Sequence, residues 1–286
     1  MFVLIGIVVV VVSVVAGFTI AGGNIVLLIQ VSEFITIGGA AIGSLLIATP
    51  LSLLKKILGT LPKILKSSKN TKEDYLQMLK GFSDLFLIAQ REGLLAIEKH
   101  IENPEKSEIL SKNKKFIEDP YRKNFFCDTM KVMLAGSVPP HEMDELMEAE
   151  IDTYEKENRP LSETIGRVGD SLPGLGIVAA VLGIIVTMGS INAGAEAVGH
   201  HVAAALVGTF LGVLLAYGFV NPIAANMALM MEEQVQDLQI IKSYILAYAK
   251  GNPPFVAAEI ARRTIFSNER PTFAELENTL RGRKDK

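Results

Sequence analysis

D-S-L-P-G-L-G-I-V-A-A-V-L-G-I-I-V-T-M-G-S, residues 170–190, decides the fold. After Asp170 the chain carries no charged residue until Glu196. An uncharged run of this length, coiled as an α-helix, can cross about 30 Å of hydrocarbon. Small residues recur in it at near-helical spacing, and such residues let a second helix approach closely. The stretch therefore predicts a transmembrane helix packed against another helix, with Pro173 either at its entrance or kinking it.

The composition indicates a membrane protein with a large soluble part. The mean hydropathy is +0.34, yet 21% of the residues are charged, and most charges gather in the middle and at the C-terminus. The single cysteine, Cys127, excludes an internal disulfide framework and a multi-cysteine metal site. His141 and Glu142 have no second histidine at helical spacing. We expect neither a metal nor a cofactor, and also no nucleic-acid partner and no enzymatic activity.

Three further uncharged runs have the length of membrane spans: Phe2–Gly22, Phe34–Leu54 and Val202–Met231. The first lacks the basic start and the cleavage site of a signal peptide, so we interpret it as a retained helix. Pro50 is expected to bend the end of the second. The sequence therefore predicts an all-α, polytopic membrane protein with four transmembrane helices and a helical cytoplasmic domain.

The lysines set the expected topology. Six of them lie between Lys55 and Lys72, whereas the preceding loop, Gly22–Glu33, offers only Glu33. Because Lys and Arg are retained in the cytoplasm, we expect the middle segment and both termini inside the cell. The expected divisions are transmembrane helices 1 and 2 in 1–54, a cytoplasmic helical domain in 55–167, transmembrane helices 3 and 4 in 168–231, and a cytoplasmic tail in 232–286.

Ionisable residues limit what the membrane part can do. The middles of the four expected spans contain none; Asp170 lies at the inner edge, and Glu33 and Glu196 lie at the outer edge. Proteins that move ions through hydrocarbon normally carry such a group, so a partner helix is expected to supply a carboxylate. The absence of internal repeats and of a catalytic constellation favours a channel-forming or structural subunit over a solo transporter or an enzyme.

Three segments occur in an order and at membrane positions typical of one known family. They are G-D-S-L-P-G-L-G-I-V-A-A-V-L-G (169–183), L-V-G-T-F-L-G-V-L-L-A-Y-G-F-V-N-P-I-A (206–224) and E-G-L-L-A-I-E-K-H-I-E-N-P (92–104). With the four-span plan they resemble the MotA family, the larger subunit of the bacterial flagellar stator. The resemblance covers essentially the whole chain. It implies a bacterial inner-membrane ring of five copies around two copies of MotB, whose aspartate carries the ion that drives torque on the rotor.

The resemblance also implies an ion pathway. Pro173 and Pro222 match two prolines near its inner end, and Thr209 matches a hydroxyl that faces the MotB aspartate. Sodium-driven relatives usually carry threonine seven residues after the first proline, where this chain has Ala180. Since a methyl group offers no oxygen ligand to dehydrated Na⁺, we favour H⁺, with Na⁺ as the alternative.

A charged pair that engages the rotor protein FliG is the second implied site. Glu98 matches its acidic member. In better-known sequences the basic member lies eight residues earlier, where this chain has Gln90, so Arg91 is the nearest base. One residue on a helix is about 100° of rotation, so the equivalence stays open.

The glycines of the last two spans, together with the resemblance, predict close helix packing and self-association as a ring. Packing is assigned to Gly176, Gly183, Gly208 and Gly212, and small-to-large changes at Gly176 or Gly212 are expected to disturb assembly. The alternative family is ExbB/TolQ, proton-driven energisers that have only one span before the large cytoplasmic part. A secondary transporter is the remaining, less favoured reading.

Overall fold

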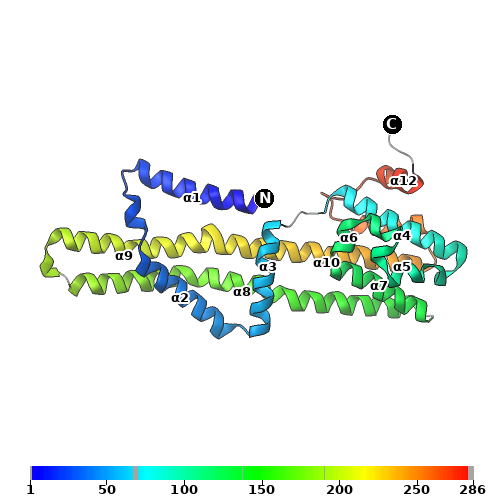
Figure 1. Cartoon of the computed structure of the whole chain (residues 1–286), viewed down its shortest axis with the longest axis horizontal. Coiled ribbons are helices and arrows are strands. Elements are labelled where there is room, and N and C mark those ends of the chain that lie inside the picture. The colour runs from blue at the N-terminus through cyan, green and yellow to red at the C-terminus, as the bar shows by residue number, and fades with distance from the viewer. Residues whose placement is uncertain (1, 67–69, 137, 190, 283–286) are drawn as a thin grey trace. The chain divides into compact units, whose positions relative to one another are not determined.

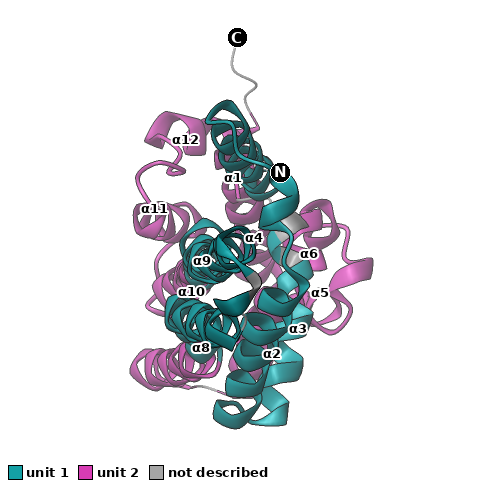
Figure 2. Ribbon diagram, turned by 90° about the vertical axis from the view of Figure 1, so that its left-hand side faces the viewer, with its two compact units in different colours: residues 1–67, 158–231 teal, residues 68–157, 232–286 magenta. Residues whose placement is uncertain are grey.

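The computed structural model describes residues 2–66, 70–136, 138–189 and 191–282, so Lys69 and Ser190, which entered the sequence argument, lie outside it. All regular structure within these ranges is helical (Figure 1), which confirms the all-α expectation. The chain divides into two compact units, each with its own hydrophobic core (Figure 2). Unit 1 comprises residues 1–67 and 158–231, and unit 2 comprises residues 68–157 and 232–286.

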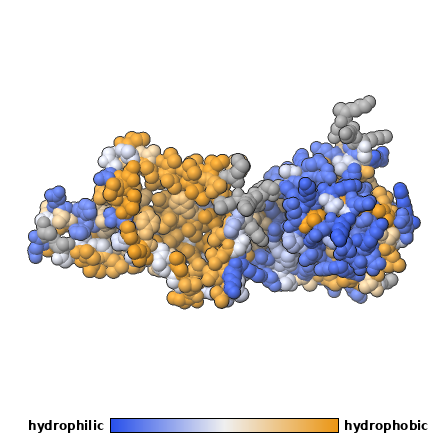
Figure 3. Space-filling view, in the orientation of Figure 1, coloured by the Kyte–Doolittle hydropathy of each residue, from blue (hydrophilic) through white to orange (hydrophobic). Residues whose placement is uncertain are grey.

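Unit 1 holds the four apolar helical segments that are long enough to cross a membrane, as predicted. The surface of this unit is largely hydrophobic in Figure 3, and α1 buries none of its residues. Such a surface is suited to lipid and to partner helices rather than to water. The helices are α1 (Phe2–Ile20), α2 (Val31–Ala48), α3 (Leu51–Lys66), the membrane part of α8 (Pro140–Gly189), α9 (Ala195–Leu215) and the start of α10 (Asn221–Ala249).

The second predicted span is shorter than expected. Instead of running over 34–54, α2 ends at Ala48, and α3 is a separate helix that starts after Pro50. Pro50 cannot continue the hydrogen-bond ladder of α2, so the chain turns there. Helix α3 is amphipathic, with Ile57 and Ile64 buried in a small core cluster. Residues 55–66, which are predicted to belong to the cytoplasmic domain, pack with unit 1 in the structure.

The third predicted span is the C-terminal part of a much longer helix. The sequence predicts a boundary between the cytoplasmic domain and the third span at residues 167–168, but α8 runs across it and is continuous over 50 residues. Pro160 and Pro173 both lie inside it. Each removes one backbone donor and leaves the helix otherwise intact, so neither acts as a terminator.

A π-helical turn, Ala216–Val220, joins α9 to α10 just before Pro222. The Asn221 N–H donates to the Ala216 carbonyl oxygen, five residues back. Since Pro222 has no N–H, a local widening of the helix reassigns the backbone hydrogen bonds beside it. Such single π turns often mark functional positions.

Unit 2 is a helical domain with an aromatic core and a largely hydrophilic surface (Figure 3). Phe82 stacks on Phe126 with ring centroids 4.3 Å apart, and Tyr244 meets Phe82 edge-on at 5.5 Å. These contacts join α4, α7 and α10 around one core. Its helices are α4 (Lys72–Glu92), α5 (Glu98–Glu102), α6 (Lys114–Glu118), α7 (Pro120–Ala135), the first part of α8, the last part of α10, α11 (Pro254–Thr264) and α12 (Phe273–Arg281).

Candidate functional site

The four glycines predicted to pack helices lie where α8 and α9 touch, a contact that we call the α8–α9 seam. A Cβ on Gly176 would lie 2.7 Å from the Gly208 carbonyl oxygen and 3.1 Å from the Gly212 Cα. A Cβ on Gly212 would lie 2.5 Å from the Leu172 carbonyl oxygen, and one on Gly183 would lie 2.7 Å from the Ala205 Cβ. Two backbones can approach this closely only when neither carries a side chain at the contact.

These glycine contacts lie within one chain. The same glycines are also predicted to support self-association as a ring, and that part stays a prediction because these contacts are those of a single chain. By contrast, an added Cβ on Gly39 or Gly43 of α2 would meet nothing within 4 Å.

The two predicted prolines flank a polar contact between α8 and α10. Asn221, the residue before Pro222, donates from its Nδ2 to the Asp170 Oδ1 at 3.0 Å. Its side chain lies directly over Gly169, where any Cβ would collide with the Asn221 amide. Gly169 is four residues before Pro173, so its carbonyl has lost its usual helical donor. Asn221 was missed from the sequence, although an Asn-Pro pair at a predicted bend was a signal for it.

Thr209 and Ala180 occupy the two sides of the seam and are both partly buried. A Cβ on Gly176 would lie 3.3 Å from the Thr209 Cα, and a Cβ on Gly208 would lie 3.1 Å from the Ala180 N. The backbones at Thr209 and Ala180 therefore lie on the two facing sides of the seam, about one helical turn apart along α8.

Glu33 is a member of this region that the sequence reading placed only at the outer edge of the membrane. It lies in the first turn of α2, is 7% exposed, and its Oε2 accepts no hydrogen bond from any described residue. A Cβ on Gly208 would stand 2.6 Å from this oxygen, so the carboxyl group points at the seam. The signal available in the sequence was that Glu33 is the first charge in the chain.

In unit 2, Arg91 and Glu98 lie at an exposed corner. Arg91 is in the last turn of α4, Glu98 opens α5, and Gly93 turns the chain between them with φ +91°. Both side chains are exposed, and neither makes a hydrogen bond or an ion pair with another described residue. Leu95, between them, is 72% exposed. This combination of free charges and an exposed leucine is available to a binding partner.

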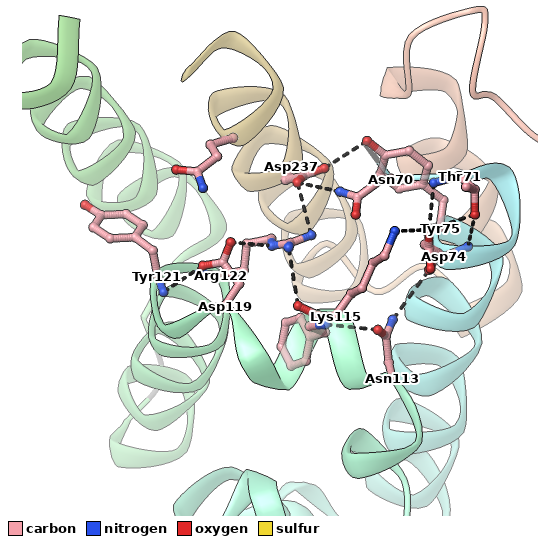
Figure 4. Close-up of polar contacts among 12 residues, drawn as sticks. Asn70, Thr71, Asp74, Tyr75, Asn113, Lys115, Asp119, Tyr121, Arg122 and Asp237 are labelled. Atoms are coloured by element: carbon pink, nitrogen blue, oxygen red, sulfur yellow. Dashed lines mark hydrogen bonds and ion pairs between the residues drawn. The ribbon is translucent and has the colours of Figure 1, made fainter. Parts of the chain in front are cut away.

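A buried polar network lies elsewhere in the same unit, near the start of α4 (Figure 4). Asp237 of α10 accepts hydrogen bonds from the Tyr75 hydroxyl at 2.9 Å and the Asn70 amide at 2.8 Å, and it pairs with Arg122 at 3.1 Å. Burial raises the pKa of Asp237 to about 6, although Arg122 opposes the rise. The network ties α10 to α4 and α7.

No group of three His, Cys, Asp or Glu side chains that could hold a metal occurs among the residues that the structure describes.

Comparison with known proteins assigns the chain. Residues 4–93 match the family model "Motility protein A N-terminal", and residues 117–240 match "MotA/TolQ/ExbB proton channel family". Motility protein A of Escherichia coli strain K12 is 36% identical over 285 residues, which cover 100% of this chain and 97% of that protein. This chain belongs to the MotA family.

Other MotA-family members agree with it along its length. Motility protein A of Salmonella typhimurium is 35% identical over 281 residues, covering 98% of this chain and 95% of the relative. The solved structure of Campylobacter jejuni MotAB has the same fold, with a TM-score of 0.79 over 94% of this chain and 98% of that one, at 22% identity. The match of the N-terminal MotA model and the four spans separate this MotA-family chain from the ExbB/TolQ alternative.

Proposed function

We propose that this chain is the stator subunit of a bacterial flagellar motor, which conducts ions together with MotB and converts their flow into torque on the rotor. The observation that carries the proposal is the α8–α9 seam, which packs Thr209 against Gly176 and Ala180 against Gly208 and leads to the proline-flanked contact at Pro173 and Pro222. Membership of the MotA family independently supports this role of the seam.

MotB is the proposed partner. The Campylobacter jejuni structure is of MotAB, which supports the same pairing here. The physical reason is the shortage of ionisable groups on the apolar helices, since Glu33 is the only buried acid of unit 1. Outward-facing apolar residues of α8, such as Ile177, Val181 and Ile185, are 52–62% exposed and offer a surface to a partner helix or to lipid.

We also propose that several copies, five by the family resemblance, form a ring in the inner membrane with both termini in the cytoplasm. The lysines after α2 support this orientation by the positive-inside rule. Arg91 and Glu98 are then cytoplasmic and are the proposed contact with FliG, because their charges have no partner within the described chain.

The coupling ion is proposed to be H⁺, with Na⁺ as the competitor. Ala180 gives the seam a methyl group where sodium-driven relatives carry a hydroxyl, and Na⁺ needs several oxygen ligands whereas a proton needs one acceptor at a time. A strain complemented with this chain and its MotB should swim at a speed independent of external sodium at fixed pH. A speed that falls toward zero without sodium and recovers on its return assigns Na⁺ instead.

The core of the proposal is tested by co-purification and complementation. The chain should co-purify with tagged MotB and restore swimming to a strain that lacks both genes. Pro173→Ala and Pro222→Ala should keep the co-purification but reduce swimming, whereas Pro160→Ala, a matched proline inside the same α8 but away from the seam, should leave both unchanged. No co-purification and no swimming with the wild-type chain would remove the proposed function.

A further inference from the structure

Glu33 is the one acidic side chain of unit 1 whose position has no structural explanation. Of the four acids in this unit, Glu163, Asp170 and Glu196 are exposed, whereas Glu33 is 7% exposed. An acid in the first turn of a helix stabilises it through the helix dipole. An exposed side chain would do so equally well, so the dipole does not explain why Glu33 is buried.

The burial of Glu33 is unfavourable as it stands. Its Oε2 is inaccessible and accepts no hydrogen bond from the described residues. The surrounding cluster is apolar and includes Ile37, Ala41, Ala179 and Val207. An ionised carboxylate without a partner is costly in such surroundings, whereas a neutral carboxyl group costs far less. The environment therefore favours a proton on this group.

The carboxyl group reaches the seam through a gap left by a missing side chain. One point, the place of a Cβ on Gly208, is 2.6 Å from the Glu33 Oε2, 3.1 Å from the Ala180 N and 3.2 Å from the Ala179 Cβ. The residue after Gly208 is Thr209, whose hydroxyl is on the proposed pathway. The atoms that α8 brings nearest to this point belong to Ala179 and Ala180, which are not titratable, whereas the Glu33 carboxyl group can hold a proton.

From this geometry we propose that Glu33 is a proton-binding residue of the ion pathway, which receives protons from the outer side and delivers them to the α8–α9 seam at Gly208. The inference rests on the proposed function. In each cycle the carboxyl O–H bond breaks, the proton passes to an acceptor carboxylate on the partner helix through Thr209 or water, and a proton from outside restores the neutral group. Glu33 is thus a proton relay that this chain contributes, and it acts before the acid of the partner helix.

The test uses full-length chain and MotB, expressed in a strain that lacks both. The variants are Glu33→Gln, which keeps the shape but cannot release a proton, and Glu33→Asp, which withdraws the carboxyl group by one methylene. Glu196→Gln is the matched control, because Glu196 is also in the first turn of a membrane helix but is exposed. Fluorescent MotB counts the stators at each motor, and motor speed is measured at low load in H₂O and in D₂O.

We expect Glu33→Gln to assemble within two-fold of wild type and to rotate at least ten-fold more slowly. Glu33→Asp should rotate at an intermediate speed and show a larger H₂O/D₂O speed ratio than wild type, since a longer proton jump becomes rate-limiting. Glu196→Gln should stay within two-fold of wild type. A change in the isotope ratio distinguishes proton transfer from a purely structural role.

Wild-type speed in assembled Glu33→Gln motors overturns the inference. If Glu33→Gln does not assemble, then Glu33→Asp decides: a wild-type speed with a wild-type isotope ratio also overturns it. In each of these outcomes the wild-type chain still restores swimming, so the proposed function is unaffected. Failure of the wild-type chain to restore swimming is the separate result that removes the proposed function.

Discussion

Replacing Gly176 by alanine should weaken the α8–α9 seam by a predictable amount. The new methyl group would stand 2.7 Å from the Gly208 carbonyl oxygen, 3.1 Å from the Gly212 Cα and 3.3 Å from the Thr209 Cα. All three neighbours are backbone atoms, so none can rotate away and the helices must separate. Overpacking of this kind costs about 1–3 kcal/mol. Against that, Gly→Ala in a helix gains about 0.5–1 kcal/mol from backbone entropy.

Gly174→Ala is the matched control, because it gains the same backbone entropy without disturbing the seam. Gly174 lies in the same helix, two residues earlier, and a Cβ there meets nothing within 4 Å. We expect the purified Gly174→Ala chain to unfold in detergent at or above the wild-type temperature and Gly176→Ala several degrees below it, a difference of about 1–3 kcal/mol between the variants. Equal melting temperatures for the two variants would refute the close approach of the two helices.

Three further predictions concern unit 2. Reversing the charges of Arg91 and Glu98 together should impair swimming strongly and leave membrane insertion intact, as measured by swimming speed and membrane fractionation. Neutralising either residue alone should weaken the contact with the rotor by under about 1 kcal/mol and so reduce swimming only in part. Because the folded pKa of Asp237 is raised, its stabilising contribution is complete below pH 4 and is lost through pH 6, so wild type should lose stability relative to Asp237→Asn over that range, by tyrosine fluorescence. Burial raises the pKa of the Cys127 thiol to about 11, so alkylation at pH 7.5 should require unfolding.

The four spans could be predicted from the sequence because they depend on run length and charge segregation, which are properties of the chain alone. The predicted contact between glycine-rich spans also followed from local spacing. The spacing alone does not show whether the contact is made within one chain or between copies, because both kinds of contact would use the same glycine face.

The continuity of α8 was mispredicted for a physical reason. Sequence rules treat an internal proline as a probable helix end, since it costs a hydrogen bond and a clash. In α8 the segment before Pro173 packs Leu161 and Ile165 in the same small cluster as α3, and that packing compensates for the loss. Tertiary contacts of this kind are not encoded in any local window.

The burial of Glu33 in the candidate site also depends on tertiary contacts and could not be predicted from the sequence. The sequence places Glu33 in the loop before the second span, whereas in the structure it lies in the first turn of α2. Which way the side chain points depends on the face that α2 presents to α9, and this face is set by Ile37 and Ala41, both buried in the shared cluster. Only the packed helices reveal that the carboxyl group enters the seam.

The position of Glu33 also bears on which ion is transported. At Ala180 the seam offers Na⁺ a methyl group in place of an oxygen ligand. With Glu33 included, the seam holds one carboxyl group, which could serve either ion. Sodium still requires several further oxygens at once, whereas most backbone carbonyls of α8 and α9 are engaged in helical hydrogen bonds. A proton requires only one acceptor after another, and the Glu33 carboxyl group opposite Gly208 is one such acceptor. A single buried carboxyl group at the seam therefore supports the proposal that H⁺ is the coupling ion.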